Sequence, residues 1–225
     1  MDHLIRDSVA PTHDLIRLSD PATLSSDTPV PPWVAATLKQ VPWVVVRRGF
    51  VRNGMMPVGV RGSVRWQRFA AVVPVTEIAE RLSPEDLANA ARVEMSGMKS
   101  VLALVALERV RPILVASGHC WGPGGSVAFE LATGVATATA NSDLDLILRL
   151  NRRITRDKAC DLLATLANVA SPARVDVLLE TPRGGVSLAD LAATAAQLLV
   201  RTPFGPRLSV DPWTLGTKTL LEMAS

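Results

Sequence analysis

Two aspartates separated by one leucine constrain this chain more than any other feature. In Ser142-Asp143-Leu144-Asp145-Leu146 polar and apolar residues alternate, which predicts a β-strand with both carboxylates on one face and the leucines in a core. Two neighbouring carboxylates repel each other, so a divalent cation that prefers oxygen ligands is their natural partner. A solvated strand edge is the alternative interpretation of the pair.

A glycine-rich turn precedes the aspartates. Ser126, the last residue of Gly124-Gly125-Ser126, lies seventeen positions before Asp143. We expect a short buried strand over 113–116 before this turn and a short helix over 127–131 after it. Free N–H groups at the start of that helix would point at phosphate oxygens, and glycine lets the backbone approach them closely. Taken alone, the segment is also typical of an ordinary loop.

A third aspartate lies in a later apolar run. Asp176 stands among valines and leucines in 175–179, a composition that predicts a strand. From a neighbouring strand its carboxylate would complete a site in which one or two Mg²⁺ ions hold a polyphosphate during phosphoryl transfer. An ion pair with Arg174 is the alternative role for Asp176.

The remaining pattern predicts an α+β protein with two domains. Residues 1–80 form a small, basic, β-rich domain, and residues 81–225 a second domain. In the first, we expect a loop through the proline-rich stretch 21–32 and then strands over 43–48, 56–60 and 65–73. Asn53-Gly54 is a hairpin turn signal between the first two of these strands.

Three helices are expected in the second domain. Ser83 and Ser187 are the expected N-caps of the first and third helices, and Thr155 is expected to begin the second. The first helix would place one apolar face inward, formed by Leu87, Ala91, Met95, Met98, Leu102 and Val105. The third would run through Leu199, and 201–213 would be loop.

Positive charge is concentrated in the first third of the chain. The net charge is +3, and no acidic residue occurs between Asp27 and Glu77, so the seven basic residues there leave about −4 (3 minus 7) for the rest. Such a segment attracts a polyanion, whether nucleic acid, a phosphorylated small molecule or an acidic protein, unless its arginines are simply solvated. The seven are Lys39, Arg47, Arg48, Arg52, Arg61, Arg65 and Arg68. Few aromatic residues lie among them, which disfavours nucleic acid.

Targeting signals are not expected. The longest uninterrupted apolar run, 101–107, has seven residues, against about 20 for a membrane-spanning helix. The N-terminus carries Asp2 and Asp7 and has no apolar stretch, unlike a signal peptide. We therefore expect a cytoplasmic protein without a membrane partner.

The two cysteines are too few for a disulfide framework. Cys120 and Cys160 are expected to be free thiols. Cys120 follows His119 and lies close to the glycine-rich turn, but a packing role is favoured over that of a nucleophile with an adjacent base.

Six segments together resemble one enzyme family. The Gly-Ser turn and the three acids resemble the nucleotidyltransferase superfamily. More closely, the chain is similar to the malonate decarboxylase holo-acyl-carrier-protein synthase family, also called phosphoribosyl-dephospho-CoA transferase. The segments are Pro57-Val58-Gly59-Val60-Arg61-Gly62, Gln67-Arg68-Phe69-Ala70, Trp121-Gly122-Pro123-Gly124-Gly125-Ser126, Ser142-Asp143-Leu144-Asp145-Leu146, Arg174-Val175-Asp176-Val177 with Glu180-Thr181-Pro182, and Gly205-Pro206-Arg207-Leu208 with Asp211-Pro212-Trp213.

The resemblance implies a fold and a reaction. The second domain would be a nucleotidyltransferase-like α/β domain with a mixed sheet and flanking helices. The enzyme would transfer the 2′-(5″-phosphoribosyl)-3′-dephospho-CoA group from 2′-(5″-triphosphoribosyl)-3′-dephospho-CoA to a serine of the apo acyl carrier subunit, releasing diphosphate. Typically acidic, that carrier protein would suit the basic first domain.

The resemblance also implies roles for particular residues. Asp143, Asp145 and Asp176 would be the catalytic Mg²⁺ ligands. Phosphate would be bound by Gly124, Gly125 and Ser126, and Arg61, Arg65, Arg68 and Arg207 would contact substrate or carrier. The step from Ser126 to Asp143 is longer than usual in the superfamily, so 135–141 is expected to be an inserted loop.

Two rival functions are another Mg²⁺-dependent nucleotidyltransferase, acting on a small molecule, nucleic acid or protein, and a non-catalytic basic binding module.

Overall fold

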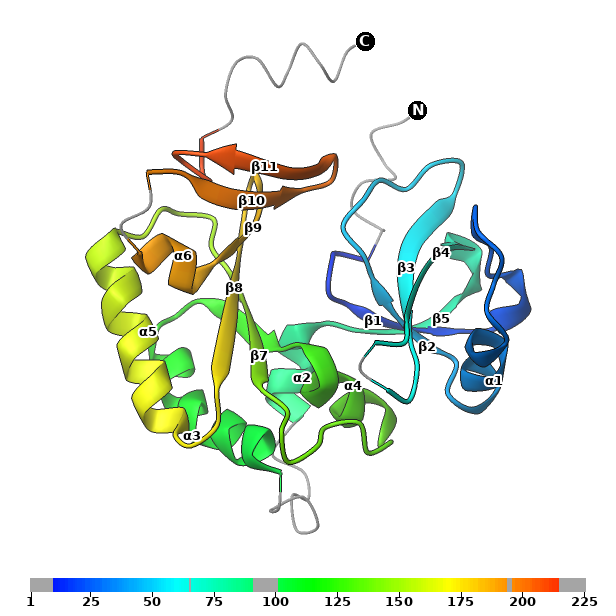
Figure 1. The fold of residues 1–225 in the computed structure, drawn as a ribbon, viewed down its shortest axis with the longest axis horizontal. Helices are drawn as coiled ribbons and strands as arrows, with labels where there is room; N and C mark the ends of the chain where they lie inside the picture. Colours follow the sequence, from blue (N-terminus) through cyan, green and yellow to red (C-terminus); the bar gives the residue numbers. More distant parts are fainter. Residues whose placement is uncertain (1–9, 65, 91–100, 194–195, 215–225) are drawn as a thin grey trace. The chain divides into compact units, whose positions relative to one another are not determined.

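The computed structural model describes residues 10–64, 66–90, 101–193 and 196–214 (Figure 1). The chain forms two compact units, one of residues 1–90 and 128–137, the other of residues 91–127 and 138–225. Each unit contains its own sheet and its own helices. The predicted α+β class is therefore confirmed. None of the described helices is long and apolar enough to cross a bilayer.

The first unit is built on a five-stranded antiparallel sheet. Its strand order is β4-β3-β2-β1-β5. The bounds are Leu15–Leu18 for β1, Trp43–Val46 for β2, Met55–Arg61 for β3, Arg68–Pro74 for β4 and Ile78–Leu82 for β5. The three predicted strands correspond to β2, β3 and β4, whereas β1 and β5 were not predicted. Asn53 and Gly54 have φ angles of 51° and 73°, as a tight hairpin turn requires.

One face of this sheet is covered by a helix that the sequence did not predict. Helix α1 spans Pro32–Gln40, and its Val34 and Leu38 pack with Met56 and Val58 of β3 in a buried apolar cluster. The expectation of a loop holds for much of 21–32, which includes the 3₁₀ helix η1 (Pro21–Thr23), but it is wrong at the end of that stretch. Pro32 occupies the first turn of α1, where a missing N–H costs nothing.

The opposite face of the sheet is covered over β1 and β2. Leu15 and Trp43 pack with Leu87 of α2 (Pro84–Ala90) and with Ala128 and Phe129 of α4 (Gly125–Thr133). A second 3₁₀ helix, η2 (Val75–Glu77), joins β4 to β5. Strands β1 and β2 therefore have buried apolar residues on both faces of the sheet.

The second unit is built on a six-stranded mixed sheet of order β11-β10-β9-β8-β7-β6. The bounds are Cys120–Pro123 for β6, Leu144–Arg149 for β7, Val175–Thr181 for β8, Gly184–Ser187 for β9, Leu198–Thr202 for β10 and Gly205–Ser209 for β11. Only β7 and β8 pair in parallel. The predicted mixed sheet is thus confirmed.

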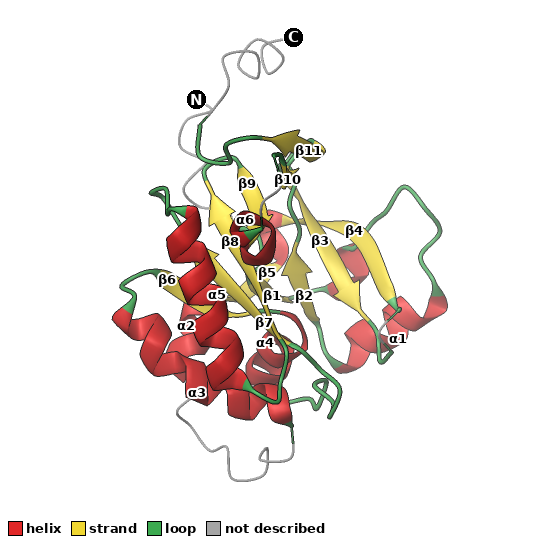
Figure 2. Ribbon diagram, turned by 60° about the vertical axis from the view of Figure 1, so that its left-hand side comes forward, coloured by secondary structure: helices red, strands yellow, loops and turns green. Residues whose placement is uncertain are grey.

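Three helices flank this sheet. Helix α3 (Leu102–Ala116) lies beside α5 (Arg156–Ala170), which connects β7 to β8, and the short α6 (Leu188–Ala192) follows β9 (Figure 2). Their apolar residues and the strand leucines form the core, in which Leu107, Leu146 and Leu179 are fully buried. A parallel pair joined by a helix is the compact solution for two adjacent strands running the same way.

The predicted N-caps Ser83 and Ser187 are confirmed, and Thr155, the predicted start of the second helix, is its N-cap. The hydroxyls of Ser83, Thr155 and Ser187 each accept a hydrogen bond from a backbone N–H three residues further on, at 3.1, 3.3 and 3.4 Å. At the first cap, Asp86 accepts from the N–H and hydroxyl of Ser83 at 2.9 and 2.7 Å. The hydrogen bond from the Ser83 hydroxyl is the main cause that lowers the pKa of Asp86.

Three other predictions for the second unit are wrong. Residues 113–116 end helix α3 rather than forming a strand, because a short apolar run fits a buried helix as well as a buried strand. The helix after Ser187 ends at Ala192, and Leu198 and Leu199 begin β10. Residues 201–213 are largely the β10–β11 hairpin rather than loop. The predicted helical positions 91, 95 and 98 lie outside the described residues.

Candidate active site

Two of the three predicted acids lie side by side on the parallel strands. Asp145 and Asp176 are register partners, each the second residue of its strand. Neighbouring strands stand about 4.8 Å apart and register partners project to the same face, so the two carboxylates share one edge of the sheet. Asp143 precedes β7, and the N–H of Leu144 donates to the carbonyl of Arg174 at 2.8 Å. The residues before both strands therefore run together beside the acids.

Arg174 lies between the carboxylates of Asp143 and Asp176. The Nη2 of Arg174 is 3.1 Å from Oδ2 of Asp176, and its Nε is 3.7 Å from Oδ1 of Asp143. The hydrogen bond to Asp176, followed by the charges of Asp176 and Asp143, raises the pKa of Arg174. The ion pair considered as an alternative for Asp176 is therefore present. Its cation also bridges to Asp143, so it compensates the repulsion within the acidic group.

The glycine-rich turn lies directly against Asp145. Strand β6 is antiparallel to β7, and beyond its end the N–H of Gly124 donates to the carbonyl of Asp145 at 2.8 Å. Gly125 has a φ of 58°, and a methyl group added there would come within 1.8 Å of Oδ2 of Asp145. Only glycine accommodates both the left-handed backbone and the close carboxylate.

The start of helix α4 presents backbone rather than the serine hydroxyl. Gly125, the first residue of the helix, is exposed, whereas Ser126 is 6% exposed. Positive partial charge at a helix N-terminus favours a nearby anion, here the carboxylate of Asp145. An incoming phosphate would meet the N–H groups of this turn, so the predicted role of Ser126 would fall on its backbone.

The acids fit a divalent cation in their chemistry. Within the described ranges no three His, Cys, Asp or Glu side chains converge closely enough to hold a metal ion. Yet Asp143, Asp145 and Asp176 offer only hard oxygen donors, and a guanidinium already lies between two of them as a cation in place of a metal. The set fits Mg²⁺ provided that Arg174 moves aside.

The other predicted residues lie elsewhere. Arg61 and Arg68 are register partners on β3 and β4, in the first unit. Arg207 is an exposed residue of β11, and Arg65 lies outside the described residues. None of these three described arginines is close in sequence to the acids.

The structure corrects one expectation and adds one residue. Cys120 is exposed at the start of β6, so the favoured packing role is wrong; Cys160 is exposed as well. Glu130 of α4 was not singled out, although it is 3% exposed and accepts from the N–H of Thr137 at 2.8 Å. An acid inside the apolar run 127–132 was the signal available in the sequence. The hydrogen bond ties Thr137, in the segment that follows α4, to the side chain of Glu130 in that helix.

Comparison with known proteins matches the chain in two consecutive parts. Two family models match, described as "Phosphoribosyl-dephospho-CoA transferase MdcG N-terminal domain" over residues 11–84 and "Phosphoribosyl-dephospho-CoA transferase MdcG C-terminal domain" over residues 87–212. Three relatives bear the name phosphoribosyl-dephospho-CoA transferase. That of Pseudomonas putida (strain W619) is 41% identical over 90% of this chain and 95% of its own length.

The other two relatives agree. The protein of Azotobacter vinelandii is 42% identical over 89% of this chain and 93% of its own length. That of Pseudomonas syringae pv. tomato is 40% identical over 90% and 93%. No solved structure matches. The chain belongs to the phosphoribosyl-dephospho-CoA transferase family.

Proposed function

We propose that this chain transfers the 2′-(5″-phosphoribosyl)-3′-dephospho-CoA group from its triphosphate precursor to a serine of the apo acyl carrier subunit of malonate decarboxylase. Diphosphate is the second product. Membership of the family supports the reaction, because the similarity extends over both units and about nine-tenths of the chain. The nucleotidyltransferase likeness of the second unit rests on the motifs described above.

The observation that carries the proposal is the register of Asp145 with Asp176 beside the Gly124-Gly125 turn. Strand pairing brings the two acids together from distant parts of the chain. The turn that pairs with Asp145 exposes Gly125 at the start of α4. Carboxylates next to a phosphate-binding backbone are what transfer from a polyphosphate requires.

The proposed step is an in-line displacement at phosphorus. The serine oxygen of the carrier forms a bond to the α-phosphorus, and the bond from that phosphorus to the bridging oxygen breaks, so diphosphate leaves with the electron pair. The serine proton passes to the carboxylate of Asp176, whose side chain is 55% exposed and open to a protein acceptor. The N–H groups at Gly125 and Ser126 hold the terminal phosphates in line.

Mg²⁺ is part of the proposal. Asp143, Asp145 and Asp176 would hold it, and once bound it would neutralise charge on the transferring and leaving phosphates. Asp145 and Asp176 belong to two adjacent strands, and Asp143 directly precedes the first of them. Arg174, released from Asp143 and Asp176, would then be available to donate two hydrogen bonds to a phosphate group.

The proposed place of action is the cytoplasm. Both cysteines are exposed free thiols, a state that persists in a reducing compartment. The donor in the proposed reaction is a CoA derivative, and the acceptor is an enzyme subunit. A chain expressed with a fluorescent tag should distribute through the cytoplasm; enrichment at the envelope would contradict this.

The test is direct modification of the carrier. The purified chain is incubated with triphosphoribosyl-dephospho-CoA, Mg²⁺ and apo carrier subunit, and the carrier is weighed by intact mass spectrometry. We expect the mass of the prosthetic group to be added, and no addition when the acceptor serine is replaced by alanine. EDTA should stop the reaction and excess Mg²⁺ should restore it.

A parallel incubation separates the rival functions. ATP or CTP in place of the precursor should leave the carrier, small alcohols and nucleic acid unmodified. Nucleotide addition to any of these, without carrier modification from the precursor, would establish a different nucleotidyltransferase. Diphosphate release from none of the donors would favour a non-catalytic binding module.

A further inference from the structure

The first unit has a sheet face that carries opposed like charges. On β3, Met56, Val58 and Val60 point into the core, so the alternate residues, Arg61 among them, point to the other face. Arg61 is the register partner of Arg68 on β4. Residues directly opposite in an antiparallel pair are close neighbours, and two like charges there are unfavourable. The mutual contact of these two arginines therefore does not itself stabilise the sheet.

A third arginine lies on the same face. A methyl group added to Gly59 would lie 3.3 Å from Cδ of Arg47 and 3.2 Å from Cγ1 of Val45. The aliphatic part of Arg47 therefore crosses the sheet over Gly59, whose register partner on β4 is the exposed Ala70. We call the surface formed by Arg47, Arg61 and Arg68 over Gly59 and Ala70 the arginine face.

Other arginines of the same sheet have carboxylate partners. Arg17 of β1 is 2.9 Å from Glu80, and Arg81 of β5 is 2.6 Å from the buried Asp14. Among the described residues, by contrast, neither Arg47 nor Arg68 has an ion-pair partner. The sequence offers none locally, since no acid occurs from residue 28 to residue 76. Within the part of the chain that the structure describes, the charges of Arg47 and Arg68 are thus uncompensated, which suits an anionic partner.

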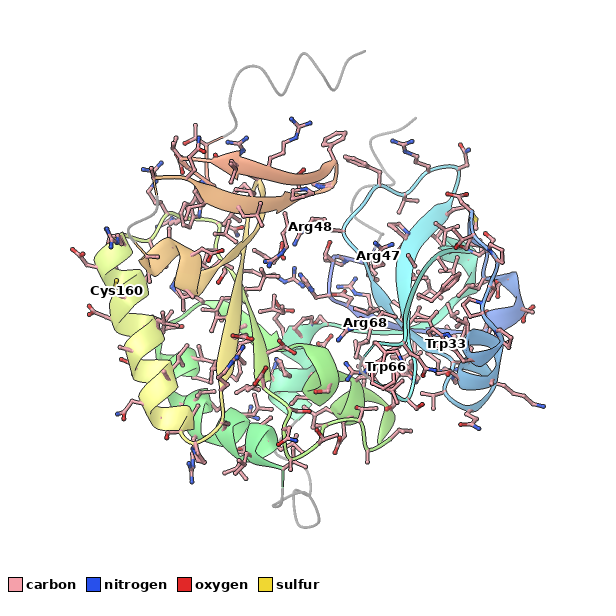
Figure 3. The ribbon with its side chains drawn as sticks, in the orientation of Figure 1. Trp33, Arg47, Arg48, Trp66, Arg68 and Cys160 are labelled. Carbon is pink, nitrogen blue, oxygen red and sulfur yellow. The ribbon has the colours of Figure 1, made fainter. Side chains whose placement is uncertain are left out.

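The form of the arginine face favours a protein over a small molecule. Arg47 bonds to Pro57 through its backbone at 2.9 Å, four residues from Arg61, so the two arginines attach about 13 Å apart along β3. The floor of the arginine face between them includes the small residues Gly59 and Ala70. Trp66, 81% exposed, stands two residues before Arg68, and tryptophan and arginine are the residues that dominate protein interfaces. Figure 3 labels Arg47, Arg68 and Trp66 on this unit.

We propose that the arginine face docks the acidic surface of the acceptor protein. Which protein this is rests on the proposed function; that the partner presents several carboxylates rests on the uncompensated charge of Arg47 and Arg68. Carboxylates on successive turns of a helix are about 5.4 Å apart, so a helix of two or three turns spans the distance between the arginines. Complementary charge of this kind raises the association rate and selects the partner.

The test reverses two charges and leaves the acids untouched. In the double variant Arg47→Glu/Arg68→Glu, we expect the KM for apo acyl carrier subunit to rise about tenfold and to lose much of its dependence on NaCl. The kcat and the KM for the triphosphate precursor should stay within about twofold of the unaltered chain, because the reacting groups are unchanged. Lys39→Glu is the matched control. It reverses one charge, half the change of the double variant, on an exposed residue of α1, which covers the opposite face of the sheet.

A second measurement does not depend on catalysis. Binding of apo carrier to the unaltered chain without precursor, followed by calorimetry, should weaken with NaCl and weaken again in Arg47→Gln/Arg68→Gln. Circular dichroism of each variant establishes that it folds. If the charge reversal destroys the fold, the glutamine pair and the NaCl dependence of the unaltered chain decide the matter.

The outcomes separate this inference from the proposed function. Transfer with a native carrier KM in the reversal variant would overturn the docking role and leave the function standing. Carrier binding that requires Arg47 and Arg68, without any transfer, would sustain docking and remove the function. A raised KM for the precursor with an unchanged carrier KM would assign the face to the small substrate and overturn the inference.

Discussion

The acidic group of the second unit and the arginine face of the first solve the same electrostatic problem differently. Asp143 and Asp176 have a cation from their own chain, because Arg174 bridges them. Arg47 and Arg68 have no carboxylate as an ion-pair partner among the described residues. Asp143 and Asp176 therefore have a compensating charge within their unit, whereas Arg47 and Arg68 have none among the described residues.

The difference indicates what each cluster needs. Arg174 offsets the repulsion between Asp143 and Asp176, and in the proposed function it would have to be displaced for Mg²⁺ to bind. The exposed charges of Arg47 and Arg68 would attract a large anionic partner most strongly, since surface charges act over about 8 Å at physiological salt. In the proposals made above, chemistry and partner selection therefore belong to separate charge clusters.

The largest effect should come from removing a carboxylate. Asp145→Asn keeps the shape of the side chain and removes its charge, so we expect carrier modification to fall by about 10³-fold or more. Binding of Mn²⁺, followed by electron paramagnetic resonance, should weaken in parallel. Asp161→Asn, on the exposed side of α5, is the control and should change neither measurement. Turnover close to that of the unaltered chain would remove the metal role.

The next effect should come from displacing that carboxylate. In Gly125→Ala the new methyl group meets Oδ2 of Asp145 at a position with a φ of 58°, so we expect a loss of about 10²-fold in kcat, in line with misplacement by about an ångström. Gly118→Ala is matched, because its φ is 69° and nothing lies within 4 Å of the added carbon. Equal losses in both variants would show that backbone strain, and not Asp145, is responsible.

A smaller effect is expected from removing the internal cation. Arg174→Gln leaves Asp143 and Asp176 without the competing guanidinium, so Mn²⁺ should bind about fivefold more tightly, the range for an exposed ion pair. Arg174→Lys should bind Mn²⁺ nearly as the unaltered chain does. Weaker binding in the glutamine variant would mean that Arg174 positions the carboxylates rather than competing for them.

The smallest effect concerns a carboxylate stabilised by hydrogen bonds instead of a cation. The hydroxyl of Ser83 lowers the pKa of Asp86, so this contribution to stability is complete above the unfolded value of about 3.9 and is lost as the pH falls through the folded value. Ser83→Ala should raise the pKa of Asp86 and cost about 1 kcal/mol at pH 7. Carboxyl titration by NMR and urea unfolding at pH 7 and pH 3 measure both; an unchanged pKa would contradict the assignment.

Local patterns carried much of the prediction. Alternation around Asp143 and Asp145 and the β-branched run around Asp176 predicted β7 and β8, and the three serine and threonine caps predicted helix starts. The register of Asp145 with Asp176 is a long-range property and could be expected only as neighbouring strands.

The errors have a common physical cause. Residues 113–116 are helical and 198–202 extended because of what they pack or pair with. Short apolar runs do not specify the choice. Arg174 was considered as a partner of Asp176 alone, since its second contact, to Asp143, depends on the parallel pairing of β7 with β8. Roles for the acids, the turn and the arginines stay predictions.

Both acids on the parallel pair occur at the amino ends of their strands. Each is the second residue of its strand, so the segments 138–142 and 171–173, which contain neither the three acids nor Arg174, lead into β7 and β8 next to the acids. Such segments tolerate changes in length and sequence far better than paired strands do. Related proteins can therefore differ in these two loops, and with them in the substrate that the proposed site accepts, while β7 and β8 keep Asp145 and Asp176. Grafting these loops between relatives is the corresponding route for engineering.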